Sequence, residues 1–277
     1  MKHLVCGWIG VICLLLLSVA CSRKEADYTI AVSQCSEDDW RAQMNKEILR
    51  EALFYPGVNV EVYQAHDDNT HQIKDIESLI ERKVDLLIVA PNEAEAITPV
   101  IEKAYDAGIP VILVDRKINS KKYTAYVGAD NYEIGRKAGE YIADRLGGKG
   151  RVIEITGLRG STPAVERHRG MMEALKATPE VQVVASAEAG WFRQKAGEVM
   201  DTLLDAHPQV NLVFAQNDRM AIGAYEKARQ KNRAGQIAFV GVDAVAGGVE
   251  SVAEGKLDAT FIYPTGGDKV IQVAMAI

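Results

Sequence analysis

From Tyr28 onward the chain alternates short runs rich in valine and isoleucine with longer amphipathic segments. Several short runs are apolar along their whole length, such as residues 86–89 (LLIV) and 111–114 (VILV). A strand that is apolar on both sides is buried on both faces, which is typical of a parallel sheet covered by helices. The alternation therefore predicts an α/β fold with right-handed crossovers and doubly wound parallel sheets.

Ten segments have the composition of strands, and ten strands are many for one twisted open sheet. A chain of 277 residues is long enough for two lobes, so we predict two Rossmann-like lobes of about five strands each. Apolar residues recur at helical spacing between the strands, as at Ile73, Ile76 and Ile80. The strand segments are 28–33, 58–64, 85–90, 109–115, 123–128, 151–156, 181–187, 210–215, 237–242 and 258–263.

No low-complexity linker separates the two predicted lobes. We therefore expect the chain to cross between them more than once, which makes a hinge and not a tether. The expected N-terminal lobe comprises residues 28–129 plus 264–277, and the expected C-terminal lobe comprises 130–263. In open α/β sheets ligands bind beyond the carboxyl ends of the strands, so the ligand cleft should lie between the lobes.

Polar residues follow most of the predicted strands. Hydroxyl groups donate and accept together, so these aspartates, asparagines and arginines suit a neutral polyol, and Trp40 and Trp191 offer rings for its apolar face. Each residue alone also has a structural interpretation, because aspartates and asparagines at such places often cap helices. The binding interpretation therefore depends on the set, which is Ser33-Gln34, Pro91-Asn92, Asp115-Arg116, Asp130-Asn131, Gln216-Asn217-Asp218, Asp243 and Tyr263-Pro264.

Residues 1–21 have the organisation of a leader. A basic start is followed by an almost unbroken apolar stretch over residues 4–20 and then by Cys21. Residues 17–21 (LSVAC) resemble a bacterial lipobox, in which Cys21 would receive the lipid. An uncleaved anchor and ordinary secretory cleavage stay open, although a membrane span usually needs about 20 apolar residues. We expect a periplasmic location with attachment to the membrane.

Composition excludes several kinds of partner and site. The formal net charge is −6 and lysine and arginine form no stripe, so nucleic acid is not expected as a partner. After the leader only Cys35 remains, which excludes an internal disulfide and a paired-cysteine zinc site. His66 and His71 match no established metal-ligand spacing, so we expect no metal and no cofactor.

The sequence also lacks the common catalytic motifs. It contains no Gly-x-Gly-x-x-Gly, no P-loop and no Gly-x-Ser-x-Gly elbow, and the glycine-rich segment 157–162 lacks the P-loop lysine. His168 and His207 have no evident nucleophile or acid beside them in the sequence. We therefore expect a binding protein and not an enzyme.

Several segments, taken together in this order, resemble the type I periplasmic sugar-binding proteins and in particular the ribose-binding group. The resemblance covers essentially all of residues 28–277. It implies two hinged lobes that close on a monosaccharide, ribose- or fructose-like, and then engage an import permease or a histidine kinase. The segments are PNEAEAI (91–97), PVILVDR (110–116), VGADNYEIGRKAGEYIA (127–143), VIEITGLRGSTPAVERHRGM (152–171), AHPQVNLVFAQNDRMAIGA (206–224), VGVDAVAGG (240–248) and GKLDATFIYP (255–264).

By motif position the resemblance implies ligand contacts from both lobes. Asp115 and Arg116 end the fourth predicted strand and match residues that bind sugar hydroxyls. Arg167 matches an arginine that reaches the ligand from the second lobe. Asn217 matches the ligand asparagine of the AQND segment, and Asp243 matches the aspartate of the VGVD turn.

Five other positions differ from the ribose binders or match them in part. Trp40 matches one aromatic of the loop after the first strand, although it also fits a hydrophobic staple at a helix start. Asp39 stands where a second aromatic is usual, and Glu37 where an asparagine is usual. Trp191 replaces a phenylalanine and Tyr263 replaces an amide. These differences imply a more acidic pocket with a different hydroxyl pattern.

The loop that contains Trp40 and Arg41 also resembles sensor domains of hybrid two-component histidine kinases, some of which recognise fructose. The family has a further strand and helix after the point where Ile277 ends the chain, so we expect a fragment of a longer protein. A receptor for a purine or an autoinducer stays open, because Trp40 and Trp191 also suit a planar base.

Overall fold

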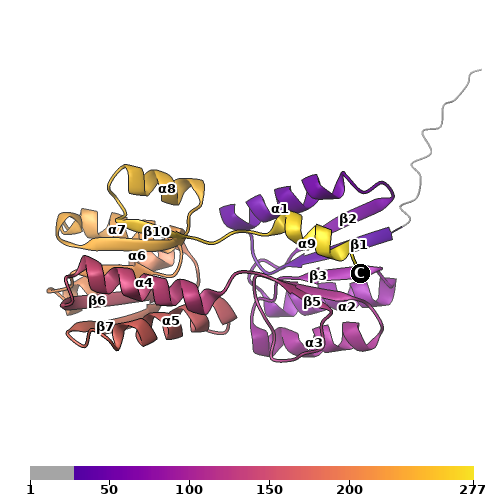
Figure 1. Ribbon diagram of the computed structural model, residues 1–277, viewed down its shortest axis with the longest axis horizontal. Coiled ribbons are helices and arrows are strands. Elements are labelled where there is room, and N and C mark those ends of the chain that lie inside the picture. The colour runs from indigo at the N-terminus through magenta and orange to yellow at the C-terminus, as the bar shows by residue number, and fades with distance from the viewer. Residues whose placement is uncertain (1–27) are drawn as a thin grey trace, which may run out of the picture.

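The computed structural model describes residues 28–277, which form two α/β lobes side by side along the long axis of the molecule (Figure 1). Each lobe contains one five-stranded parallel sheet. All ten predicted strands are present within these residues, and the prediction of two doubly wound lobes is confirmed. Cys21 and the proposed leader lie outside the described residues.

The N-terminal lobe has the strand order β2-β1-β3-β4-β5. Helix α1 and the C-terminal helix α9 pack together on one face of its sheet, and α2 and α3 pack together on the other. The bounds of these elements are β1 Tyr28–Gln34, α1 Asp39–Ala52, β2 Val58–Gln64, α2 Asn69–Arg82, β3 Leu86–Val89, α3 Ala94–Asp106, β4 Val111–Val114, β5 Ala125–Val127 and α9 Gly267–Ala274.

The C-terminal lobe has the strand order β10-β9-β8-β6-β7. Helices α4 and α5 cover one face of the sheet, and α6 and α7 cover the other. The bounds are α4 Asn131–Arg145, β6 Gly150–Thr156, α5 Thr162–Leu175, β7 Val181–Glu188, α6 Arg193–Ala206, β8 Leu212–Ala215, α7 Asp218–Gln230, the 3₁₀ helix η1 Ala234–Gln236, β9 Ala238–Asp243, α8 Ala246–Ala253 and β10 Ala259–Ile262.

Alternate residues of the central strands supply the cores on the two faces of each sheet. Ile30 and Val32 of β1 pack towards α1 and α9, whereas Ala31 between them packs towards α2 and α3. The strands Leu86–Val89 and Val111–Val114 are buried at every position, as their continuous apolar runs predict. Full burial of one such side chain stabilises the fold by about 1.5–3 kcal/mol.

Several helices have an N-cap residue whose side chain accepts a hydrogen bond from a backbone amide of the first turn. The Asn217 side chain accepts from the Met220 amide at 2.9 Å, so the cap interpretation of Asn217 is confirmed. Asp115 and Asp243 cap no helix: no helix follows Asp115 directly, and α8 begins after Val245. Both aspartates instead have positive φ, 62° and 119°, which places them in tight bends after β4 and β9.

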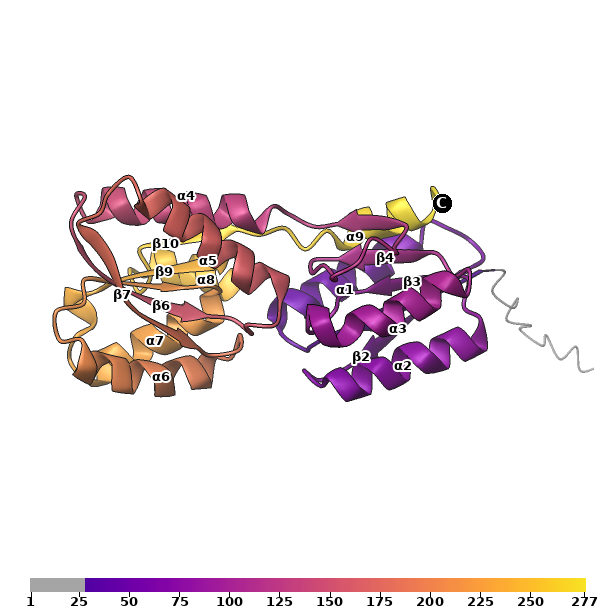
Figure 2. The same ribbon diagram turned by 90° about the horizontal axis from the view of Figure 1, so that it is seen from below.

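Within residues 28–277 the chain crosses between the lobes at 128–130 and again at 263–266 (Figures 1 and 2). The crossings lie close together, since a Cβ on Gly266 would be 3.3 Å from Val127. The lobes also touch away from the crossings, where the Ala94 amide donates to the Gly160 carbonyl at 3.0 Å. None of the helices described has the length and apolarity that a membrane span requires.

Candidate ligand-binding site

A cavity lies between the lobes, at the carboxyl ends of the strands of both sheets. This is the edge at which open α/β sheets bind ligands. The N-terminal lobe contributes side chains from the start of α1 and from the end of β4. The C-terminal lobe contributes side chains from α5, from the segments after β7 and β8, and from the end of β9. The lining residues are Asp38, Trp40, Arg41, Asp115, Arg116, Pro163, Arg167, Trp191, Asn217, Asp243 and Tyr263.

Asp115 is the centre of the N-terminal half of the site. It forms a buried ion pair with Arg41, lies 3.6 Å from Arg116 Nε, and accepts from the Tyr263 hydroxyl at 2.5 Å. Burial alone would raise the pKa of Asp115, but Arg41 and Arg116 and these hydrogen bonds outweigh it and hold the pKa below its usual value. Asp115 is therefore an ionised acceptor.

Arg167 is the corresponding centre of the C-terminal half. It is almost fully buried, and its guanidinium donates to Asn131 Oδ1 at 2.8 Å and to the Gln216 carbonyl. Arg167 Nη1 lies 4.0 Å from Asp243 Oδ1. Burial raises the pKa of Asp243 well above its usual value although Arg167 acts in the opposite direction. Ionised Asp243 therefore gains strongly from any further hydrogen-bond donor.

Two aromatic groups bound the cavity. Trp40 stacks on Tyr263 with ring centroids 5.2 Å apart, and its indole Nε1 donates to the Tyr263 carbonyl at 3.0 Å. Two guanidinium groups, those of Arg116 and Arg167, each lie 5.7 Å from the centroid of the Trp191 ring. These contacts hold both indole rings in fixed orientations at the cavity wall.

The backbone conformation of Trp191 and the glycine beneath its ring both place the indole at the cavity wall. Trp191 has a φ of 77°, which non-glycine residues rarely adopt, and its ring packs directly on Gly157. A Cβ at Gly157 would lie 2.1 Å from the ring, so only glycine leaves room for the indole there. Trp191 Nε1 and Arg116 Nε are buried and have no hydrogen-bond partner among the described residues.

Eight of the ten site residues expected from the sequence line this cavity, and two do not. Glu37 is 55% exposed and lies 3.5 Å from His66. Asp39 is exposed in the first turn of α1. Since consecutive helix residues point in different directions, the start of α1 at Asp39 turns the neighbouring side chains towards the cavity and Asp39 away from it.

Sequence reasoning missed three lining residues, Asp38, Arg41 and Pro163. Asp38 caps α1 by accepting from the Arg41 amide at 2.8 Å, and its carboxylate lies 3.7 Å from Arg219 of the other lobe. Of the three neighbouring acids, Asp38 is the one that caps α1, so the position of the helix start is the signal that could have found it. Arg41 follows Trp40 on the buried side of α1, but no sequence pattern distinguishes a buried arginine from an exposed one.

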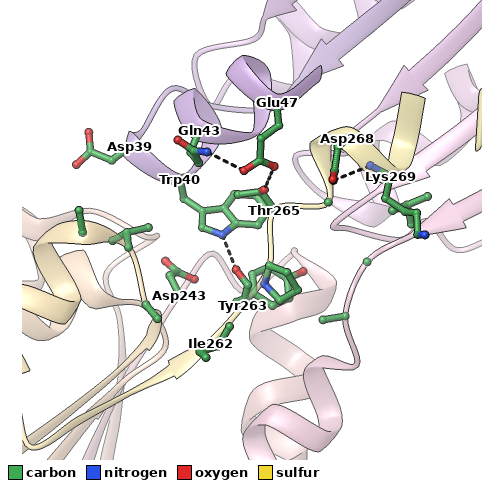
Figure 3. A pocket seen from close by; sticks show the side chains of 18 of the residues that line it. Asp39, Trp40, Gln43, Glu47, Asp243, Ile262, Tyr263, Thr265, Asp268 and Lys269 are labelled. Atoms are coloured by element: carbon green, nitrogen blue, oxygen red, sulfur yellow. Dashed lines mark hydrogen bonds between the residues drawn. The ribbon is translucent and has the colours of Figure 1, made fainter. Parts of the chain in front are cut away.

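A second, larger cavity of about 840 Å³ lies on the hinge side of the same pair of aromatics (Figure 3). Trp40, Asp243 and Tyr263 line both cavities, so the Trp40–Tyr263 pair is a wall between them. Glu47 connects the crossing segment to α1, because it accepts from the Thr265 hydroxyl (Figure 3). It also accepts from the Gly267 amide at 3.3 Å. The inner cavity is only about 40 Å³, so the lobes must move apart to admit a sugar-sized ligand.

A family model described as "Periplasmic binding protein domain" matches residues 30–277. The chain belongs to this family. The ribose import binding protein of Bacillus subtilis (strain 168) is 33% identical to it over 240 residues, 86% of this chain and 77% of that protein. The ribose import binding protein of Escherichia coli (strain K12) is 35% identical over 204 residues, 74% of this chain and 68% of that protein. The resemblance seen in the sequence is confirmed.

Solved structures agree with this assignment. The fructose-binding periplasmic domain of a hybrid two-component system is 54% identical, with a TM-score of 0.89 over 90% of this chain and 84% of that one. A galactofuranose-binding protein is 29% identical, with a TM-score of 0.83 over 88% of this chain and 86% of that one. The family consists of solute-binding proteins, so this periplasmic binding protein is not an enzyme, as its sequence predicts.

Proposed function

We propose that this periplasmic binding protein binds a fructose-like monosaccharide in the inner cavity by closure of its two lobes, and that it is the sensor domain of a two-component system. The observation that supports the choice of ligand and role is the 54% identity to a fructose-binding sensor domain, against 33–35% to the ribose import proteins. The lining side chains support a sugar in general.

The chemistry of the cavity matches a small polyol. Asp115 and Asp243 offer carboxyl oxygens as acceptors from opposite lobes, and Arg116 and Arg167 offer donors. Hydrogen bonds to charged groups contribute about 1.5–3 kcal/mol each, so a few of them suffice for tight binding. The ligand would contact both lobes at once, and therefore binds the closed arrangement better than an open one.

Import is the second candidate role, since the ribose import relatives cover most of the chain. In both roles the closed lobes would be recognised by a membrane partner, either a permease or a histidine kinase module.

We further propose that the domain is attached to the membrane through its N-terminal segment, with Cys21 as the lipidation site. The parent should then incorporate a radiolabelled fatty acid and Cys21→Ser should not, and equal incorporation in the two proteins would contradict lipidation at Cys21.

A panel of ligands in a thermal-shift assay tests the proposed function. A ligand that binds only the folded state at 100 times its Kd stabilises by about 2.7 kcal/mol, which raises the Tm by several degrees. We expect D-fructose to give the largest shift, D-ribose a smaller one and adenine none. A shift with adenine and none with any pentose or hexose would contradict sugar binding and favour a purine receptor.

A further inference from the structure

Asn131 is buried at the point where the first crossing enters α4, and its side chain contacts both halves of the site. It is 1% exposed and is not among the residues that line the inner cavity. Its Oδ1 accepts from Arg167 Nε at 2.8 Å. Its Nδ2 donates to the Tyr263 hydroxyl at 3.3 Å, and Tyr263 belongs to the second crossing.

These contacts belong to a continuous chain of side-chain hydrogen bonds. The Tyr263 hydroxyl in turn donates to Asp115 Oδ1 at 2.5 Å. The order Asp115, Tyr263, Asn131, Arg167 thus leads from the N-terminal lobe, through the second crossing and the first residue of α4, to the C-terminal lobe. All four residues are at most 5% exposed, so water competes little for these hydrogen bonds. Arg167 also lies over the Tyr263 ring, 4.6 Å from its centroid.

We propose that Asn131 is a positioning residue that couples the arrangement of the two lobes to the orientation of Arg167 and Asp115. The proposal rests on the proposed function, because these two side chains are assigned there to the ligand. A rotation of the lobes about the crossings moves Tyr263 relative to Asp115 and Asn131 relative to Tyr263. The chain of hydrogen bonds is therefore complete in the closed arrangement and is broken when the lobes separate.

The amide of asparagine is suited to this place by its two functional ends. It accepts from a cation with one end and donates to a hydroxyl with the other. An aspartate would keep the bond to Arg167 but would compete with Asp115 for the Tyr263 proton. A leucine would leave Arg167 Nε and the Tyr263 hydroxyl without this partner in a buried site, which destabilises the arrangement that contains both groups.

A purely structural role in starting α4 does not explain these contacts. The cap of α4 is Asp130, whose side chain accepts from the Glu133 amide at 3.0 Å. A substitution at Asn131 leaves that cap in place. A change in the arrangement of the lobes in an Asn131 variant can therefore be attributed to the lost coupling and not to a destabilised α4.

The first test measures the distance between the lobes without any sugar. Spin labels at Lys103 on α3 and Lys176 after α5 are well exposed and lie on different lobes. Pulsed dipolar spectroscopy on the sugar-free protein should show longer and broader distances for Asn131→Leu than for the parent. Asn211→Leu is a matched control, because the Asn211 side chain accepts from the Arg151 amide at the opposite end of the β6 and β8 strands, away from the site. Equal distributions in the parent and the Asn131 variant would overturn the proposal.

The second test is a double-mutant cycle on D-fructose affinity. Asn131→Asp and Tyr263→Phe should each weaken binding on the order of tenfold, and together by much less than the product, because they interrupt one chain. Multiplicative losses, or an unchanged affinity in Asn131→Asp, would contradict coupling. If the parent itself binds no sugar, the proposed function fails, and the distances between the lobes still decide the role of Asn131.

Discussion

At the scale of single residues, the three adjacent acids before Trp40 have different environments. Only Asp38 reaches the inner cavity, whereas Glu37 faces solvent beside His66. We predict that Asp38→Asn weakens D-fructose binding about tenfold, the loss expected for one charge-assisted hydrogen bond. Asparagine caps helices as well as aspartate does, so the Tm should change little.

Glu37→Gln is the matched control, because it removes the same charge one residue away. Calorimetric titrations of the two variants should differ, with the parent affinity kept in Glu37→Gln. Equal losses in both variants would mean that the whole acidic segment acts through its charge and not through contact with the ligand.

Prediction from sequence worked best where a residue's place follows from the fold. Asp115 and Asn217 come just after mainly apolar strands and Asp243 ends one, and the carboxyl ends of parallel strands meet at one edge. The site residues at the start of α1 were harder to predict. Asp38 lines the cavity and Asp39 does not, and this depends on the exact residue at which the helix begins. Arg41 was missed because its burial depends on Asp115, 74 residues away in the sequence.

At the scale of secondary-structure elements, helices α4 and α5 are in such close contact that glycine is required between them. A Cβ on Gly135 would lie 2.1 Å from the Arg167 carbonyl oxygen. Gly135→Ala should therefore separate the helices, destabilise the fold by about 1–3 kcal/mol and displace Arg167, so that D-fructose binds more weakly. Urea unfolding and calorimetry measure the two effects.

Gly197 in α6 is the matched control for this prediction. The nearest atom to its added Cβ would be the Gly223 carbonyl oxygen at 3.4 Å, an ordinary contact. Gly197→Ala should stabilise the helix by about 0.5–1 kcal/mol and leave binding unchanged. Destabilisation by Gly197→Ala, or none by Gly135→Ala, would contradict this account of the helix packing.

The pairing of α5 with β6 predicts a dependence of stability on pH. His168 Nδ1 lies 2.7 Å from Oε2 of the fully buried Glu154, and this hydrogen bond raises the pKa of His168 although burial acts against it. A pKa raised by folding stabilises the protein below the unfolded value of about 6.5, and this contribution disappears as the pH rises through the folded value. The Tm advantage of the parent over His168→Gln should therefore be larger at pH 6 than at pH 9. A difference that grows with pH would contradict the assignment.

At the scale of the whole molecule, the arrangement of two lobes followed from the number of strands and the absence of a linker. The enclosure of the site could not be predicted from the sequence. It depends on contacts between loops of different lobes, such as the hydrogen bond from Ala94 to Gly160, and no local sequence pattern indicates that these loops meet. The identity of the ligand likewise depends on side-chain placement across the cleft. The central claim is therefore that residues from both lobes bind one sugar together.

Isothermal titration calorimetry with D-fructose on the parent protein and on Arg167→Ala tests this claim most directly. We expect one sugar per protein in the parent. We expect an affinity loss of about 2–3 kcal/mol in the variant, on the order of 30- to 150-fold, because the second lobe loses its buried cation. No heat of binding in the parent, or the same affinity in Arg167→Ala, would contradict it.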